Sequence, residues 1–340
     1  MTAKNITFIL ELTKKCNNNC KYCYNVWKND LNYPAKELNL IEWKNLIKII
    51  TNQVKPASWG VSGGEPLLHP NAIEIIKLLK KTKRPITLIT NGTQLTEKNV
   101  RQLLWNKVKN IELPLVGANA ETHDSLTRNI GSWEKVIRSM KLVKKYYGRL
   151  TTVFVITKQN CKQIKEMAEI AIAMGSDVIL ANYFNAGGEG IKYRDELSIN
   201  SQELKLVLDE LDYYAKEYEI PISFGVPVPP CVLDITKYKN IIFGYCPIGK
   251  ENPYYAVDPA GNLRMCNHSR IILGNLFEES LEQIFNKDIY KNYINSIPKE
   301  CSRCIKLEKC NASCRASGEV CFGTTEQLAP FVKNNFQIGC

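Results

Sequence analysis

The chain has 340 residues, 44% of them apolar, which is enough to bury the core of one large domain and a smaller one. The apolar run from Ile6 to Leu12 near the start is too short for a secretion signal or a membrane span, so both are excluded and a cytoplasmic location is expected. The formal net charge of +11 suits an acidic protein partner, but Lys is spread in ones and twos without interleaved aromatic residues, so nucleic-acid binding is disfavoured.

The thirteen cysteines are the most unusual feature of the composition. Because no export signal is visible, the chain is expected in a compartment that keeps thiols reduced, which argues against a framework of disulfides. Metal ligation is the better use for so many thiols, and an anaerobic or microaerobic setting is expected.

From Ile6 to about Tyr183 the sequence alternates short β-branched runs with segments of helical periodicity, the pattern of a parallel sheet flanked by helices. The expected strands are Ile6–Leu12, Ala57–Val61, Ile86–Thr90, Asn110–Leu115, Leu150–Ile156 and Asp177–Tyr183. The expected helices are Leu38–Thr51, Asn71–Lys81, Thr96–Trp105, Trp133–Tyr147 and Cys161–Met174. Six such units are fewer than the eight of a complete (β/α)8 barrel.

The end of the first expected strand carries a short cysteine cluster. Cys16, Cys20 and Cys23 stand in a C-x3-C-x2-C spacing. Three thiolates on such a loop can hold three irons of a four-iron, four-sulfur cube, and the fourth iron then has no protein ligand and is open to chemistry. A zinc knuckle or three accidental core thiols are the alternative, but the residues between the cysteines offer zinc no fourth ligand.

Two further turns follow the second and third expected strands. Residues 63–66 read Gly-Gly-Glu-Pro, where glycines let the backbone approach a ligand, and residues 90–92 read Thr-Asn-Gly. Ligands of parallel α/β proteins bind just beyond the C-terminal ends of the strands, so both turns lie where a site is expected. Taken alone, a Gly-Gly is usually just a turn, and an Asn-Gly is most often a plain turn.

The cysteine spacing, the aromatic Tyr22 directly before its third member and the Gly-Gly-Glu-Pro turn together resemble the radical S-adenosylmethionine (SAM) enzymes. This resemblance implies an α/β fold, a partial (β/α)6 TIM-like barrel, whose [4Fe–4S] cluster and SAM lie at the C-terminal mouth of the strands. It also implies that Tyr22 packs on the adenine, with a core position as the alternative, and that the glycine turn meets the amino group of SAM. The expected SAM-binding residues are Tyr22, Gly63, Gly64, Glu65 and Asn91.

The resemblance is incomplete after the fourth expected strand. Residues 114–117 read Pro-Leu-Val-Gly where many relatives have a Ser-Leu-Asp-Gly type of segment, so no SAM contact is carried over there. The stretch 121–124, Glu-Thr-His-Asp, is expected to cap a helix, and His69 is expected to be structural. No residue is assigned a catalytic acid, base or hydrogen-donor role.

The second half begins with a helix expected over Gln202–Tyr218, capped by Ser201, that bridges two domains. The proline-rich residues 227–230 then interrupt regular structure, and nine of the thirteen cysteines lie beyond them. The expected domains are the barrel at residues 1–190, a bridging segment at 191–230 and a cysteine-rich module at 231–340.

The cysteines of this module have a specific spacing. Cys246 is followed by Gly261-x4-Cys266 after a hairpin-like Asp-Pro-Ala-Gly turn, and a C-x2-C-x5-C-x3-C quartet begins at Cys301. The pattern resembles the SPASM domain, a C-terminal extension of radical SAM maturases that usually holds two auxiliary iron–sulfur clusters. Two auxiliary [4Fe–4S] clusters are therefore expected, each with about four thiolates.

The resemblance also implies how these thiols are divided. The first auxiliary cluster is expected to use Cys246, Cys266 and Cys314, with Cys231 as the candidate fourth ligand. The second is expected to use Cys301, Cys304 and Cys310. Its fourth ligand is Cys321 or Cys340, and Cys321 is favoured because a terminal residue frays.

The leading hypothesis from these resemblances is an enzyme that reductively cleaves SAM to a 5′-deoxyadenosyl radical and abstracts hydrogen from a ribosomal peptide, installing a crosslink or epimerising a residue. Small-molecule or cofactor biosynthesis is an alternative. Sulfatase maturation, which makes formylglycine, is another, but the catalytic Asp expected directly after Cys266 is replaced by Asn267. A non-catalytic iron–sulfur or zinc protein is the alternative from a different class.

The expected partners follow from the same chemistry. The substrate is a peptide or small protein, and an acidic flavodoxin or ferredoxin donates the electron to the first cluster. No winged-helix domain precedes the first expected strand, so leader recognition is expected to use the barrel rim, the second module or a separate leader-binding protein. The substrate, the bond formed and the oligomeric state are left open by the sequence.

Overall fold

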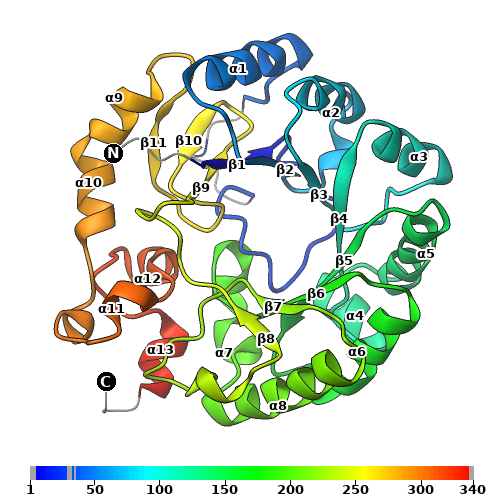
Figure 1. Ribbon diagram of the computed structural model, residues 1–340, viewed down its shortest axis with the longest axis vertical. Helices are drawn as coiled ribbons and strands as arrows, with labels where there is room; N and C mark the ends of the chain where they lie inside the picture. Colours follow the sequence, from blue (N-terminus) through cyan, green and yellow to red (C-terminus); the bar gives the residue numbers. More distant parts are fainter. Residues whose placement is uncertain (1–4, 29–32, 34–35, 337–340) are drawn as a thin grey trace.

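One curved sheet with helices along its outer side organises the protein (Figure 1). The computed structural model describes residues 5–28, 33 and 36–336. Eleven strands follow the order β11-β10-β9-β1-β2-β3-β4-β5-β6-β7-β8. Every pair from β9 through β1 to β8 is parallel, and the pairs of β10 with β9 and β11 are antiparallel.

Strands and helices alternate along the first two thirds of the chain. The strands are β1 Thr7–Glu11, β2 Ser58–Ser62, β3 Ile86–Ile89, β4 Val108–Pro114, β5 Leu150–Ile156, β6 Val178–Tyr183, β7 Ile222–Phe224, β8 Ile241–Phe243, β9 Tyr254–Val257, β10 Asn262–Arg264 and β11 Ile272–Asn275. The helices are α1 Leu40–Gln53, α2 Ala72–Lys80, α3 Glu97–Trp105, α4 Ala120–Thr127, α5 Ser132–Lys145, α6 Ile164–Ala173, α7 Arg194–Leu197, α8 Ser201–Glu217, α9 Leu281–Asn286, α10 Asp288–Asn295, α11 Leu307–Cys310, α12 Arg315–Phe322 and α13 Pro330–Asn335.

The six expected strands are confirmed as β1 to β6, with bounds that differ by at most two residues. The parallel sheet then continues through β7 and β8, which the sequence did not predict because each is only three residues long. Since β8 and β11 are the two ends of the strand order, the sheet does not close, and the expected partial barrel is confirmed.

Capping side chains decide where the outer helices begin. Thr96, the first residue of the expected helix, is the cap of α3, accepting a bond from the backbone N of Asn99. The expected cap Ser201 is wrong, because Ser201 is already helical. Asn200 caps α8 instead, since its Oδ1 accepts from the backbone N of Glu203 at 2.8 Å and the Glu203 carboxylate accepts from the N of Asn200.

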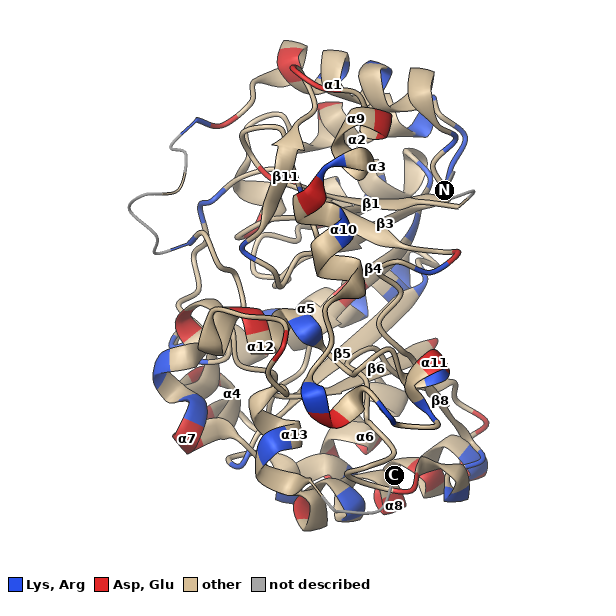
Figure 2. Ribbon diagram, turned by 90° about the vertical axis from the view of Figure 1, so that its left-hand side faces the viewer, with Lys and Arg blue, Asp and Glu red and all other residues tan. Residues whose placement is uncertain are grey.

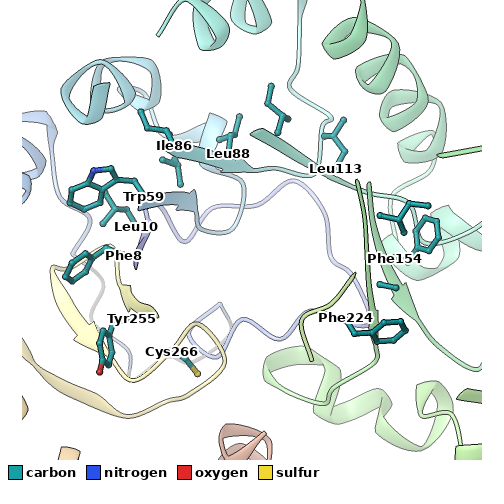
Figure 3. Packing of buried hydrophobic residues seen from close by; sticks show 14 of the residues in the cluster. Phe8, Leu10, Trp59, Ile86, Leu88, Leu113, Phe154, Phe224, Tyr255 and Cys266 are labelled. Carbon is teal, nitrogen blue, oxygen red and sulfur yellow. The ribbon is translucent and has the colours of Figure 1, made fainter. Parts of the chain in front are cut away.

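The core lies between the sheet and the outer helices (Figure 3). Side chains alternate across each strand, so Phe8 and Leu10 on β1 face outward and are fully buried. The Phe8 ring lies 5.8 Å from that of the fully buried Trp59. Burying each such side chain stabilises the fold by about 1.5–3 kcal/mol. The alternate positions, including Glu11 and Glu112, therefore face the inside of the curved sheet.

The cysteine-rich module joins the same sheet. Strand β9 pairs in parallel with β1, with Phe8 opposite Tyr255. The expected turn between β9 and β10 is confirmed: the N of Gly261 donates to the carbonyl O of Asp258 at 3.0 Å, and Gly261 has the left-handed φ of +86° that favours glycine. This hairpin carries Cys266 back toward the beginning of the chain.

Charged residues of both signs are interspersed over the outer helices in the view of Figure 2. Across the described ranges, none of the helices combines the length and the apolar character that crossing a bilayer requires.

Candidate active site

The loop after β1 runs through the centre of the ring of strands and carries the three N-terminal cysteines (Figure 1). The backbone N of Cys23 donates to the carbonyl O of Cys20 at 3.2 Å, and the N of Asn18 donates to Cys16 Sγ at 3.4 Å. After burial, the charges of Cys23 and Cys16 both raise the pKa of Cys20, so the three thiols are close neighbours. The structure therefore brings these three predicted ligands together.

Electrostatics show what this trio fits. Burial, followed by the neighbouring charge of Cys23, raises the pKa of Cys20 to about 12. Burial also raises the pKa of Cys16 and of Cys23, while nearby Lys28 lowers both. Three adjacent thiolates would repel one another at low dielectric, and a cationic metal core removes that cost because metals deprotonate their thiol ligands. The donor set fits an iron–sulfur cluster.

The Gly-Gly-Glu-Pro turn lies directly against the cysteine loop. The N of Gly64 donates to the carbonyl O of Thr13 at 2.8 Å, and the N of Glu65 donates to that of Lys15 at 2.8 Å. A Cβ on Gly64 would collide with the Lys15 carbonyl, and Gly63 has a φ of +140° with the Thr13 O only 2.7 Å from an added Cβ. Both glycines are therefore required for the two backbones to meet in a close-packed turn, the cradle.

Glu65 ties this turn to the end of β3. Its fully buried carboxylate accepts bonds from Thr90 Oγ1 at 2.7 Å, from the N of Asn91 at 2.8 Å and from the N of Leu67 at 3.1 Å. The Asn91 side chain in turn donates to Asn17 Oδ1 at 2.9 Å and lies 3.9 Å from Cys16 Sγ. Four of the five expected SAM-binding residues thus converge on the cysteine loop.

Tyr22, the fifth, packs in a small apolar cluster. The cluster contains Val116, Leu126, Phe184, Ala186 and Leu197. The Tyr22 hydroxyl makes a hydrogen bond with the Cys20 thiol. Its ring is therefore half-buried beside the cysteines.

The histidine expectations concern the surroundings of the site. His69 bonds the carbonyl O of Leu38 and the backbone N of Asn71, so its role is structural as expected. Within the stretch 121–124, Asp124 caps α5 by accepting from the N of Gly131 and of Trp133. The first turn of α4 is capped by Asn119 instead.

The loop after β6 is a contact that the sequence analysis missed. An added Cβ on Gly187 would lie 2.6 Å from His268 Cε1, and Gly188, with a φ of +48°, lies against the Asn25 backbone. His268 Nε2 is 2.9 Å from the carbonyl O of Ala186. The double glycine four residues after the end of an expected strand was the available signal, because it is the same kind of signal as residues 63–64.

Apart from Cys321, the described cysteines of the module form two groups, and the first contains Cys246, Cys266 and Cys314. Burial raises the pKa of both Tyr254 and Tyr293, and the charges of all three thiols raise it further, so the thiols lie near the same tyrosines. Burial, followed by the charge on Cys246, raises the pKa of Cys314 to about 11. The side chain of Asn185 donates to Cys314 Sγ at 3.2 Å.

The second group differs from the expected one. One cavity is lined by Cys231, Cys301, Cys304 and Cys310. Cys231 was expected with the first group, but the proline-rich segment places it in the wall of this cavity, beside Cys301, Cys304 and Cys310.

Cys321, the favoured fourth ligand of the second group, is not among the residues that line this cavity. Its Sγ is 3.8 Å from the carbonyl O of Ala186, and its side chain packs near Val26 and Trp27. The structure therefore places Cys321 outside the wall of this cavity. The alternative, Cys340, is outside the described residues.

Side chains connect the hairpin to the central loop. Asn267, next to Cys266, donates to the Tyr24 hydroxyl at 3.0 Å, and the Tyr24 ring lies 5.8 Å from that of His268. On the same hairpin, the buried Arg264 pairs with Glu11 and donates to the carbonyl O of Ser269 at 2.8 Å. The N-terminal cysteines and the module thus border the same space.

Comparison with known proteins agrees with this geometry. The sequence pattern of the Radical SAM superfamily matches residues 10–171, and that of SPASM, an iron–sulfur cluster-binding domain, matches residues 246–311. The two matched ranges contain the N-terminal cysteine trio and most cysteines of the module.

Individual relatives span nearly the whole chain. The AdoMet-dependent heme synthase of Methanosarcina barkeri is 26% identical over 337 residues, 94% of each protein. The antilisterial bacteriocin subtilosin biosynthesis protein AlbA of Bacillus subtilis is 26% identical over 88% of this chain and 64% of its own length. Streptococcus suis SuiB bound to its precursor peptide SuiA shares the fold with a TM-score of 0.76, at 16% identity, over 97% of this chain and 76% of SuiB. The protein is thus a member of the radical SAM enzymes that carry a C-terminal SPASM domain.

Proposed function

We propose that the protein modifies a peptide, installing a crosslink or epimerising a residue at the mouth of the barrel. The carrying observation is that Asn267 and His268, which follow Cys266, contact Tyr24 and Ala186. A substrate that reaches the central loop therefore also meets the SPASM module. The subtilosin biosynthesis protein AlbA, similar over 88% of this chain, supports a peptide substrate.

In this proposal each N-terminal motif has one task. Cys16, Cys20 and Cys23 hold a [4Fe–4S] cluster, and the cradle at Gly63 and Gly64 admits the amino group of SAM. When bound, SAM and this cluster supply a 5′-deoxyadenosyl radical that removes a hydrogen atom from the substrate. Glu65 and Asn91 keep the cradle and the cysteine loop in register through the bonds described above.

The SPASM module supplies two further sulfur-ligated sites. Residues 231–340 would hold two auxiliary clusters, which accept or relay an electron after hydrogen removal. A flavodoxin or ferredoxin would reduce the first cluster, and the chain's formal charge of +11 favours such acidic partners.

A second candidate substrate is a tetrapyrrole. The heme synthase relative matches 94% of this chain and of its own length, which is more complete than the match to AlbA. This alternative keeps the same radical chemistry and changes only what binds at the mouth.

One experiment separates the two candidates. Protein reconstituted anaerobically with iron and sulfide is incubated with SAM and dithionite, together with either a short peptide encoded beside its gene or a carboxylate-bearing tetrapyrrole. Peptide-dependent release of 5′-deoxyadenosine, with hydrogen lost from the peptide or one solvent deuterium incorporated, supports peptide modification. Release that only the tetrapyrrole stimulates counts against it and favours the second candidate.

A further inference from the structure

We infer that Cys231 completes a four-thiolate site with Cys301, Cys304 and Cys310, and that the site of Cys246, Cys266 and Cys314 has three thiolates. This inference rests on the proposed auxiliary clusters. It takes the fourth ligand of the second cluster from Cys231, which precedes the quartet in the sequence. The resemblance implied a cysteine that follows the quartet, Cys321 or Cys340.

The first support is the cavity itself. Its wall combines the four thiols with apolar side chains and a proline turn: Pro229, Pro230, Leu307, Leu328 and Val332. Such a wall keeps water away and leaves sulfur as the main polarisable donor. Four thiols around one cavity match the number of protein ligands that a four-iron, four-sulfur cube takes.

The second support is how firmly Cys231 is placed. The N of Val232 donates to the carbonyl O of Pro229 at 2.9 Å, which folds the segment into a turn. The Tyr183 hydroxyl at the end of β6 donates to the carbonyl O of Pro227 at 2.9 Å. Prolines have a restricted φ, so this segment presents its thiol with little conformational freedom to lose.

The third support is the backbone conformation between Cys310 and Cys314. Asn311, Ala312 and Ser313 between them have left-handed φ values of 53°, 57° and 61°. Three successive non-glycine residues in this region are strained and persist only where the surroundings hold them. Asn311 Nδ2 is held by the carbonyl O atoms of Cys246 at 2.9 Å and Ile248 at 3.1 Å.

This left-handed run directs the two cysteines to different places. Cys310 lines the cavity with Cys231, whereas Cys314 is not among the residues that line it and instead accepts a hydrogen bond from the side chain of Asn185 at 3.2 Å. A quartet that is continuous in sequence is therefore divided between two sites, with three members on one side and one on the other. Cys231 supplies the fourth thiol where three are present.

The test counts clusters in a parent variant that lacks the N-terminal trio, Cys16→Ala/Cys20→Ala/Cys23→Ala, so that SAM chemistry plays no part. Two auxiliary cubes give this parent about eight irons per chain. Into it are placed Cys231→Ala, Cys301→Ala and Cys246→Ala, singly and in pairs, and iron and sulfide are measured together with the EPR spectrum of the reduced protein. Cys161→Ala is the matched control, since Cys161 is a half-buried thiol that lines no such cavity.

Non-additivity reports which thiols share a cluster. We expect Cys231→Ala/Cys301→Ala to lose no more iron than Cys301→Ala alone, and to keep the EPR signal of the other cluster. Cys231→Ala/Cys246→Ala should lose iron and signals from both. The opposite pattern, or full iron retention in Cys231→Ala with loss in Cys321→Ala or Cys340→Ala, overturns the inference.

Folding and the wider proposal are checked separately. Cys231→Ser keeps the size of the side chain, so the same non-additive pattern in that variant excludes a misfolded segment as the cause. A parent without iron overturns this inference together with the auxiliary clusters of the proposed function, whereas iron that divides differently between the thiols overturns this inference alone.

Discussion

The two sulfur-rich regions of the molecule are held in place by different means. At the barrel mouth, successive parallel strands end side by side and backbones pack on backbones, as Gly64 does on the cysteine loop. In the SPASM module a few individual side chains position the turns, such as the buried Arg315, which donates to the carbonyl O atoms of Tyr293 and Ile248. The mouth is therefore specified by short, repeated patterns, and the module by single long-range contacts.

The largest expected effect is a loss of SAM cleavage at the mouth that leaves the iron of the SPASM module in place. Cys20→Ala removes one ligand of the N-terminal trio, so SAM-dependent release of 5′-deoxyadenosine should fall to the background of protein without SAM. The auxiliary iron, about eight of about twelve irons, should remain because the module has its own ligands. Chromatography of 5′-deoxyadenosine and iron analysis measure both. Loss of all iron would show that the module depends on the mouth.

The second prediction concerns the seam between the regions. Arg264 on β10 is buried against Glu11 on β1, which also accepts from Trp27 Nε1 at 2.6 Å. Arg264→Met leaves the Glu11 carboxyl without its cation, so the free energy of unfolding should fall by about 3–5 kcal/mol. Anaerobic guanidinium denaturation, followed by tryptophan fluorescence, measures the change.

Two further variants establish its origin. In Glu11→Gln/Arg264→Met no unpaired charge is left at the seam, so this double variant should be more stable than Arg264→Met alone. Lys77→Met removes an exposed pair with Glu74 and should cost no more than about 0.5 kcal/mol. An equal loss of unfolding free energy in Arg264→Met and Lys77→Met would mean that burial of the Arg264–Glu11 pair adds nothing to its effect on stability.

The same contrast explains what the sequence predicted. The strands β1 to β6 and the approach of Gly63, Glu65 and Asn91 to the cysteines could be predicted because periodicity and motifs are local. The pairing of β9 with β1 could not be predicted, since the residues of a short strand do not specify which strand it pairs with. The division of the module's thiols depends on left-handed residues 311–313, none of which is the glycine that would signal them.

The third prediction tests the inner face of the barrel. Glu112 lies on that face of β4, and burial raises its pKa to about 7 from the ordinary 4.5. Between these pH values the unfolded chain releases the proton while the folded protein keeps it, so the contribution of Glu112 to stability is complete below pH 4.5 and is lost as the pH rises toward 7. The loss is at most about 3 kcal/mol.

The measurement compares Glu112→Gln with the natural sequence at pH 5 and pH 8. Gln stays neutral, so the variant should be relatively more stable at pH 8, while the difference at pH 5 stays small. Using the difference between proteins cancels other titrating groups, such as His123, whose pKa is lowered to about 4 by burial. A difference that does not change with pH would show that Glu112 is ionised in the folded protein.

The smallest expected effect on stability probes the mouth alone. In Gly64→Ala the new methyl group must push the turn away from the Lys15 carbonyl, which should cost about 1–3 kcal/mol in unfolding free energy. Gly131→Ala is the control, because nothing lies within 4 Å of the added Cβ, and its left-handed φ of +79° is a source of strain that Gly64 does not share. If backbone packing shapes the cradle, Gly64→Ala should also weaken SAM binding measured by calorimetry on the reconstituted protein, while Gly131→Ala leaves it unchanged. Equal SAM affinity in both variants would mean that the cradle tolerates displacement. The contrast between backbone packing at the mouth and single side-chain contacts in the module would then be wrong.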